Sequence, residues 1–340
     1  MEKKQRDLSI DYLRFIGLAM VILAHVSIPF TLSQLRCFDV PLMVFISGLT
    51  ASGRITNKYI VYICDRSKRL LIPVYLFLTI YFVFLYILSL FNISPVSLTV
   101  KKVIHSYLLL EGIGYVWIIR VFLMIMLLTP LLVRFEQLCK REFLYGVVCL
   151  VFLLLNDIIL DSFAFPIFEL KIMNIFFTDY IMYFVGYIPS FMLGLRMRYA
   201  SYKIKSVYTI GCIACLVIAG WCYMHTYGCP VRLSPEYKFP PKFYFLIYGT
   251  TISMLLWISK RYVGIVIDFL KLKSIAIHVG QNSIWIYLWH IPFIPVLYSF
   301  VDSWLIRYVL VFVSALLMFE VQKQLAQRYC SRNIRKYLIG

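Results

Sequence analysis

Charged residues are scarce in this chain, and acidic ones are the rarer kind. Only 15% of the 340 residues are charged, with 16 Asp and Glu against 34 Lys and Arg, whereas 62% are hydrophobic. A chain with so little charge cannot bury its apolar surface in one soluble core. The scarcity excludes a soluble globular protein and predicts an all-α, polytopic membrane protein, because helices satisfy their own backbone hydrogen bonds within lipid.

Several other features are missing. No soluble domain, low-complexity linker or internal repeat is evident, so we expect one membrane domain over residues 1–340 that does any chemistry itself. No small-residue cleavage site follows the first apolar segment, which indicates a retained helix. Nine cysteines are scattered along the chain. The C-x-x-C of Cys212 and Cys215 lacks a second ligand pair, so no metal site is expected, while Cys37 and Cys229 could pair.

Apolar runs of about 20 residues, the length that crosses a bilayer, recur along the chain. We predict a helical bundle of about ten transmembrane helices near residues 8–30, 37–53, 70–93, 115–134, 143–160, 179–195, 206–225, 243–259, 281–300 and 304–325. The basic residues concentrate on one side of such a bundle if both termini are cytoplasmic. The net charge of +18 therefore indicates topology and contact with membrane lipid rather than nucleic-acid binding.

The first predicted span carries ionisable residues that are hard to explain as packing. Asp7, Asp11 and Arg14 follow one another at helical spacing, and His25 lies eleven residues after Arg14. Eleven residues return a helix to within roughly 20° of its starting direction, so Arg14 and His25 should share a face, about 16 Å apart along the axis. Charges at such depth line a cavity, pair or take part in chemistry. Asp11 either orients Arg14 or binds a cofactor, and His25 either reacts or bonds to a carbonyl.

Four further residues are candidates for lining an interior cavity or contacting an acceptor. His290 should point inward at middle depth of its helix, where it either lines the site or forms an internal hydrogen bond. Arg120 lies within the fourth predicted span and needs a partner, such as Glu111. Trp117 and Tyr287 fit an interfacial aromatic belt or helix contacts as well as a cavity wall.

Residues 6–25, RDLSIDYLRFIGLAMVILAH, resemble the opening of the acyltransferase-3 family of integral membrane acyltransferases, in which ten residues separate an arginine from a histidine. The basic stretch RSKRLLIPVY (66–75) resembles that family's cytoplasmic loop running into proline. Other segments resemble the family in the same order: FDVPLMVFISGLTASGR (38–54), YVWIIRVFLMIMLLTPLL (115–132), FPPKFYFLIYG (239–249) and GQNSIWIYLWHIPF (280–293). The likeness extends over nearly the whole chain, although residues 143–225 show little that aligns.

This resemblance implies an enzyme of the inner or plasma membrane that serves polysaccharide biosynthesis in the cell envelope. Its expected reaction is O-acetylation, or transfer of another short acyl group, from acetyl-CoA or another acyl-CoA to a hydroxyl of a surface glycan or lipid-linked precursor. Acyl-CoA is then a substrate, and no permanently bound cofactor is expected.

The residues of the chain give this expected reaction a physical basis. Arg66, Lys68 and Arg69 suit the phosphates of acyl-CoA at a cytoplasmic mouth, with Arg14 just inside. Neutral His25 would act as general base on the acceptor hydroxyl, since imidazole titrates near neutrality. A covalent acyl-histidine intermediate is a second route.

A transporter or flippase for a glycan precursor is the alternative function. It would also have about ten spans and buried charges, but transporters often carry paired interrupted helices and internal repeats, which this sequence lacks. A purely structural membrane subunit would not require an arginine and a histidine on one face of the first span.

Overall fold

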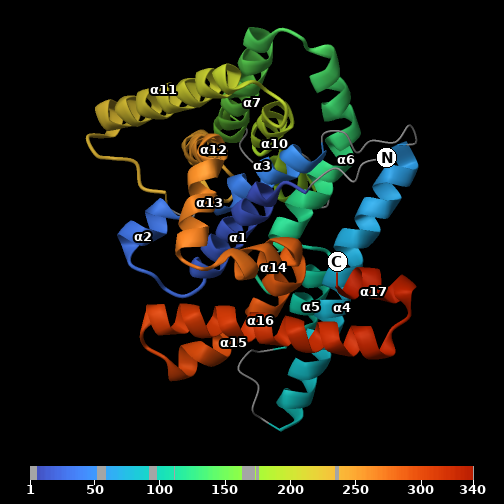
Figure 1. The fold of residues 1–340 in the computed structure, drawn as a ribbon. Coiled ribbons are helices and arrows are strands. Elements are labelled where there is room, and N and C mark those ends of the chain that lie inside the picture. Colours follow the sequence, from blue (N-terminus) through green and yellow to red (C-terminus); the bar gives the residue numbers. More distant parts are fainter. Residues whose placement is uncertain are drawn as a thin grey trace. The chain divides into compact units, whose positions relative to one another are not determined.

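The computed structural model describes residues 6–51, 59–91, 98–110, 112–162, 173, 176–233 and 237–339 (Figure 1). Regular secondary structure in these ranges is helical. The helices are α1 (Leu8–Leu23), α2 (Phe30–Leu35), α3 (Asp39–Ala51), α4 (Tyr59–Leu90), α5 (Val100–Tyr107), α6 (Trp117–Leu138), α7 (Glu142–Ser162), η1 (Phe176–Met182), α9 (Tyr183–Val185), α10 (Ile188–Met197), α11 (Tyr202–Tyr227), α12 (Phe243–Ile258), α13 (Lys260–Phe269), α14 (Lys273–Gln281), α15 (Ser283–Phe300), α16 (Trp304–Tyr329) and α17 (Arg332–Leu338).

Seven segments of the described chain are long and apolar enough to cross a membrane. They are Phe30–Ala51, Tyr59–Leu90, Trp117–Leu138, Glu142–Leu160, Tyr202–Tyr227, Ser283–Phe300 and Trp304–Tyr329. The helical, multi-pass architecture agrees with the expectation from the sequence. The count of ten spans and the cytoplasmic placement of both termini stay predictions.

Three of the predicted spans differ in length or continuity from the helices observed. α1 has 16 residues, or about 24 Å at 1.5 Å per residue, which is less than the hydrocarbon thickness of about 30 Å. The predicted span 179–195 is divided among η1, α9 and α10, and Pro189 occupies the first turn of α10, where its missing N–H is tolerated. The predicted span 243–259 is the apolar α12, also 16 residues long.

The chain forms two compact units. Unit 1 comprises Met1–Ser33, Ile60–Leu123 and Ile267–Gly340, and unit 2 comprises Gln34–Tyr59 and Met124–Val266. In unit 1, α1 packs against α14, α15 and α16, and α15 lies beside α16. The core of this unit includes the fully buried side chains of Leu13, Ile22 and Trp285.

Backbone contact joins α1 to α14 within unit 1. A Cβ atom on Gly280 would meet the Asp11 carbonyl oxygen and lie 2.7 Å from the Asp11 Cα atom. Because the obstructing atoms belong to the backbone, they cannot rotate away, and only glycine permits this approach. Gly280 thus allows α14 to contact the backbone of α1 at Asp11, whose carboxylate is buried.

A second close approach occurs within unit 2, between α3 and α10. A Cβ atom on Gly48 would meet the Phe191 carbonyl oxygen and lie 2.9 Å from the Leu195 nitrogen. A Cβ atom on Gly194 would likewise meet the Phe45 carbonyl oxygen. Small residues that allow backbones to approach are typical of helix contacts in membranes.

Replacement of Gly48 with alanine should destabilise the protein by about 1–3 kcal/mol, because α3 and α10 must separate to admit the methyl group. The measurement is the thermal unfolding midpoint of the purified protein in detergent. The matched control is Gly211→Ala on α11, where a Cβ atom meets nothing within 4 Å. Equal midpoints for the two variants would show that the α3–α10 contact tolerates a side chain.

All nine cysteines are free thiols. Cys37 is buried and Cys229 is exposed, so the pairing that the sequence allowed is not formed. Cys212 is buried on α11, where its carbonyl accepts a hydrogen bond from the Thr251 hydroxyl of α12 at 3.2 Å. This cysteine packs at a helix contact as a small, weakly polar side chain.

Candidate active site

The first turns of α1 hold a buried carboxylate between two guanidinium groups. The Asp7 side chain caps the helix by accepting a hydrogen bond from the Ser9 N–H at 3.1 Å. The Asp11 side chain is 2% exposed and accepts hydrogen bonds from Arg6 Nε at 2.8 Å and Arg6 Nη2 at 2.9 Å. Arg14 Nη1 lies 3.9 Å from Asp11 Oδ1. A negative charge here also interacts favourably with the N-terminus of α1.

Arg6, rather than Arg14, is thus the principal partner of Asp11. The helical ladder in the sequence predicted the pairing with Arg14, which the structure retains only as the longer contact. Arg6 precedes the helix, so its side chain can fold back over the first turn and bind both carboxylate oxygens in a bidentate pair. The Arg14 side chain remains 28% exposed.

His25 lies just beyond α1, in a turn, and not within the long helix predicted over residues 8–30. Its backbone N–H donates to the Ile22 carbonyl at 3.0 Å. Beyond this turn, Ser27 adopts a positive φ of 52° and Pro29 has no N–H to donate, so the helix does not extend to residue 30 as predicted. The imidazole therefore comes from the connection between α1 and α2.

Three aromatic rings meet at this turn. The centroids of the His25 and Tyr115 rings are 4.7 Å apart in an edge-to-face arrangement, and those of His25 and His290 are 5.5 Å apart with an interplanar angle of 29°. Tyr115 also contacts His290 edge-on, with centroids 6.0 Å apart. The candidates His25 and His290, predicted from the sequence, are thus brought together, although they are 265 residues apart in the chain.

The tautomer of His290 follows from its contacts. Its side chain is completely buried on α15, and Nδ1 is hydrogen-bonded to the Tyr287 carbonyl. A carbonyl can only accept, so Nδ1 carries the proton and Nε2 keeps a lone pair. Nε2 is buried and has no hydrogen-bond partner among the described residues. This nitrogen is therefore a base without a partner of its own, beside the His25 ring.

Tyr287 holds the two sides of this cluster in place. Its hydroxyl donates to the Tyr115 carbonyl, and its own carbonyl accepts from His290. We refer to His25, Tyr115, Tyr287 and His290 as the histidine–tyrosine cluster. The sequence did not single out Tyr115, since a tyrosine beside an apolar span is common at membrane interfaces.

Trp117 and Arg120 lie in the first turn of α6, shortly after Tyr115. Trp117 is half-buried, and Arg120 is only 3% exposed. A buried guanidinium so close to the cluster agrees with a polar interior in unit 1. Glu111, the partner suggested for Arg120, lies outside the described residues.

Arg66, Lys68 and Arg69 lie on α4 and not in the loop that the sequence predicted. The helix starts at Tyr59, and its 32 residues reach about 48 Å. This length exceeds a hydrocarbon core of about 30 Å. The turn that carries Arg66, Lys68 and Arg69 can therefore lie outside the apolar layer and still be helical. The Arg66 guanidinium lies 5.7 Å from the Tyr62 ring centroid, and Lys68 and Arg69 are exposed.

A comparison with protein families matches residues 7–319 to the model of an acyltransferase domain. The chain belongs to the acyltransferase-3 family. The match includes both units and every member of the histidine–tyrosine cluster. Neither the curated proteins nor the solved structures contain a significant match.

Membership of the acyltransferase-3 family confirms the identification made from residues 6–25 and supports a membrane acyltransferase. The apolar helices of this acyltransferase-3 protein indicate a multi-pass membrane protein. The chemistry of acyl transfer requires a group that can remove a proton from an acceptor. The imidazoles of the histidine–tyrosine cluster are groups of that kind.

Proposed function

We propose that this protein transfers an acetyl or another short acyl group from cytoplasmic acyl-CoA to a hydroxyl of a cell-surface glycan or its lipid-linked precursor. The observation that carries the proposal is the stacking of two imidazoles, His25 and His290, in a chain of the acyltransferase-3 family. The proposed setting is the inner or plasma membrane, where a cytosolic donor and an envelope acceptor are both accessible.

The chemical step uses His25 as general base. His25 takes the proton of the acceptor hydroxyl, the hydroxyl oxygen bonds to the thioester carbonyl carbon, and the carbon–sulfur bond breaks. The departing CoA thiolate receives the proton from His25, so the imidazole is neutral again after each turnover. General-base catalysis of this kind contributes about a hundred- to ten-thousand-fold to the rate.

His290 positions the acceptor in this scheme by binding a second hydroxyl of the glycan, because the reacting hydroxyl has only one proton and gives it to His25. Its Nε2 lone pair can accept a hydrogen bond but cannot donate one, because Nδ1 holds the proton against the Tyr287 carbonyl. The Tyr115 edge packs against both imidazoles and restricts their rotation. Tyr287 supports the arrangement by fixing the backbone of Tyr115.

Cationic groups supply the binding site for the donor in this proposal. Acyl-CoA carries phosphates at its nucleotide end, and guanidinium groups bind phosphate through paired hydrogen bonds. Arg66, Lys68 and Arg69 present three cations on one turn of α4. Arg14 adds a cation on α1, with Nη1 3.9 Å from the buried Asp11 carboxylate.

Loss of Arg69 should raise the KM for acyl-CoA by about five- to tenfold and change kcat little, since an exposed cation contributes modestly to phosphate binding. The measurement is the steady-state rate of CoA release over a range of acetyl-CoA concentrations. The matched control is Arg261→Ala, an exposed arginine on α13. An unchanged KM in Arg69→Ala would place the donor phosphates elsewhere.

The class of donor is tested by release of free CoA. Purified protein in lipid vesicles is supplied with acetyl-CoA or succinyl-CoA, with and without envelope glycan, and the released thiol is measured with a thiol reagent. We expect CoA release from at least one donor, and we expect it to increase with glycan. No release from any acyl-CoA, together with movement of intact lipid-linked sugar, would favour a flippase.

A further inference from the structure

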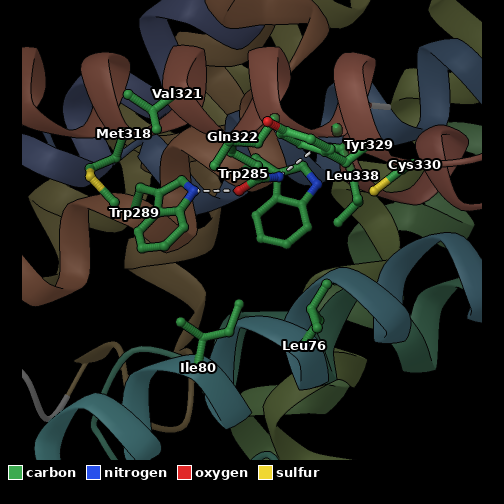
Figure 2. Close-up of a pocket in the computed structure, with 12 residues that line it drawn as sticks. Leu76, Ile80, Trp285, Trp289, Met318, Val321, Gln322, Tyr329, Cys330 and Leu338 are labelled. Carbon is green, nitrogen blue, oxygen red and sulfur yellow. Dashed lines mark hydrogen bonds between the residues drawn. The ribbon is translucent and has the colours of Figure 1, made fainter.

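An apolar groove lies in unit 1 between α4, α15 and α16, with a volume of about 430 Å³ (Figure 2). Leu76 and Ile80 of α4 form one wall, facing Trp289 and Met318 across the gap in the close-up. No member of the histidine–tyrosine cluster lines the groove. Its size is typical of a ligand-binding pocket, about 300–1,000 Å³.

The polar atoms in the wall of the groove are bonded to one another. Trp289 Nε1 donates to Gln322 Oε1 at 2.6 Å, and Gln322 Nε2 donates to the Leu338 carbonyl at 2.6 Å. Trp285 Nε1 donates to the Tyr337 carbonyl at 2.9 Å. The dashed lines in Figure 2 mark the hydrogen bonds between the residues drawn there. The groove is therefore left with an apolar surface that offers a ligand few hydrogen bonds.

The position of the groove determines which ligand can enter it. α4, α15 and α16 are all candidate membrane spans, so the lining residues of these helices lie beside hydrocarbon. Ile80, Val321 and Leu325 are 45%, 51% and 54% exposed, which keeps the groove open to the bilayer. Water gains nothing in such a site, whereas a hydrocarbon chain fills it with dispersion contacts.

A basic surface adjoins the groove where α16 ends. α17 is fastened back onto α16, because Arg335 Nη2 donates to the carbonyls of Gln327 and Cys330 at 2.9 and 3.1 Å. Arg332 and Lys336, one helical turn apart on α17, are exposed. Residues 321–340 contain no Asp or Glu, so no acidic side chain from this segment opposes these cations.

We propose that the groove binds one acyl chain of an anionic phospholipid, whose phosphate contacts Arg332 and Lys336. The apolar lining selects a hydrocarbon chain, and the basic residues of α17 select a negative headgroup over a zwitterionic one. Leu338 lines the groove and belongs to α17, so a single lipid can reach both features. The site is separate from the proposed reaction centre and serves to hold α4, α15 and α16 together.

The first test asks whether the groove holds an acyl chain, and it fills the groove with a larger side chain. Wild-type protein and Ile80→Trp are reconstituted in vesicles of equal phosphatidylglycerol and phosphatidylcholine and repurified, and retained lipid is quantified by mass spectrometry. We expect wild type to retain phosphatidylglycerol and Ile80→Trp to retain several-fold less. The control is Val83→Trp, an exposed position of α4 that does not line the groove. Equal retention in all three proteins would overturn the proposal.

The second test asks whether α17 binds the lipid headgroup, and it removes the two positive charges proposed to contact the phosphate. The double variant Arg332→Gln/Lys336→Gln should lose its preference for phosphatidylglycerol over phosphatidylcholine by about tenfold or more, since each basic residue near the surface contributes about fivefold. Arg261→Gln/Lys203→Gln removes the same charge from exposed positions in unit 2 and should change nothing. An undiminished preference in the first variant, or retention of both lipids equally by wild type, would contradict an anionic lipid site.

Discussion

Replacement of His25 with alanine should lower the rate of acyl transfer by about a hundred- to ten-thousand-fold, the contribution of a positioned general base. The variant removes the imidazole that stacks on His290 and contacts Tyr115, yet it leaves α1 intact, because His25 lies in the turn beyond the helix. The loss should therefore appear in kcat, with insertion into the membrane unchanged. The measurement is the initial rate of acetyl transfer at saturating acetyl-CoA.

His225→Ala is the matched control for this experiment. His225 is exposed on α11 in unit 2, where it contacts Trp221, so the same change removes an imidazole far along the chain from the proposed chemistry. Its transfer rate should equal that of wild type. Activity in His25→Ala at the level of the control would exclude His25 as the base.

Two substitutions at His290 should show whether its side chain accepts a hydrogen bond or only fills space. His290→Phe keeps a ring in the buried position but removes Nε2, and we expect kcat to fall by about ten- to a hundredfold, the loss of one buried hydrogen bond. His290→Gln keeps an oxygen that can accept a hydrogen bond, so it should retain more activity than the phenylalanine variant. Both rates are measured with thermal unfolding midpoints alongside.

The relative kcat values of these two variants decide the role of His290. If glutamine and phenylalanine reduce kcat equally while the midpoints stay level, the Nε2 lone pair does not position the acceptor. If phenylalanine is fully active, His290 serves packing alone. The prediction requires activity in the order wild type, glutamine, phenylalanine.

The candidate residues of the first span could be named from the sequence, because ionisable side chains stand out against an apolar background, although the helix ends before His25. The ladder from Asp7 to Arg14 and the spacing to His25 were visible in residues 6–25, and the family match confirmed the family that these residues resemble. His290 was named from one face of its helix, and it does stack on His25. Sequence reasoning succeeds where one residue type is rare in its surroundings.

Contacts between distant or irregular segments could not be predicted in this way. Arg6 precedes α1, so helical spacing gave no reason to pair its side chain with Asp11. Tyr115 joins the cluster from a connection between helices, and tyrosines are frequent in such positions here. The connection after α1 includes a positive φ at Ser27, which the side chain of serine does not signal.

Helix boundaries were also difficult to predict where a helix carries several charged residues. The basic stretch containing Arg66 and Arg69 looked like a loop, because hydropathy falls there, but α4 continues through it from Tyr59. Lysine and arginine are good helix formers, so loss of hydropathy marks the edge of the membrane and not the end of the helix. The cations proposed to bind the donor are accordingly held on a regular helix.

Transfer of label from acetyl-CoA to glycan shows whether the protein is an acyltransferase that uses His25 as its base. Membranes containing equal amounts of inserted wild type, His25→Ala or His225→Ala receive acetyl-CoA labelled in the acetyl group, and alkali-labile label in the envelope glycan is counted. We expect label with wild type and His225→Ala and almost none with His25→Ala. Equal label in all three samples, or no label with wild type above membranes lacking the protein, would contradict it.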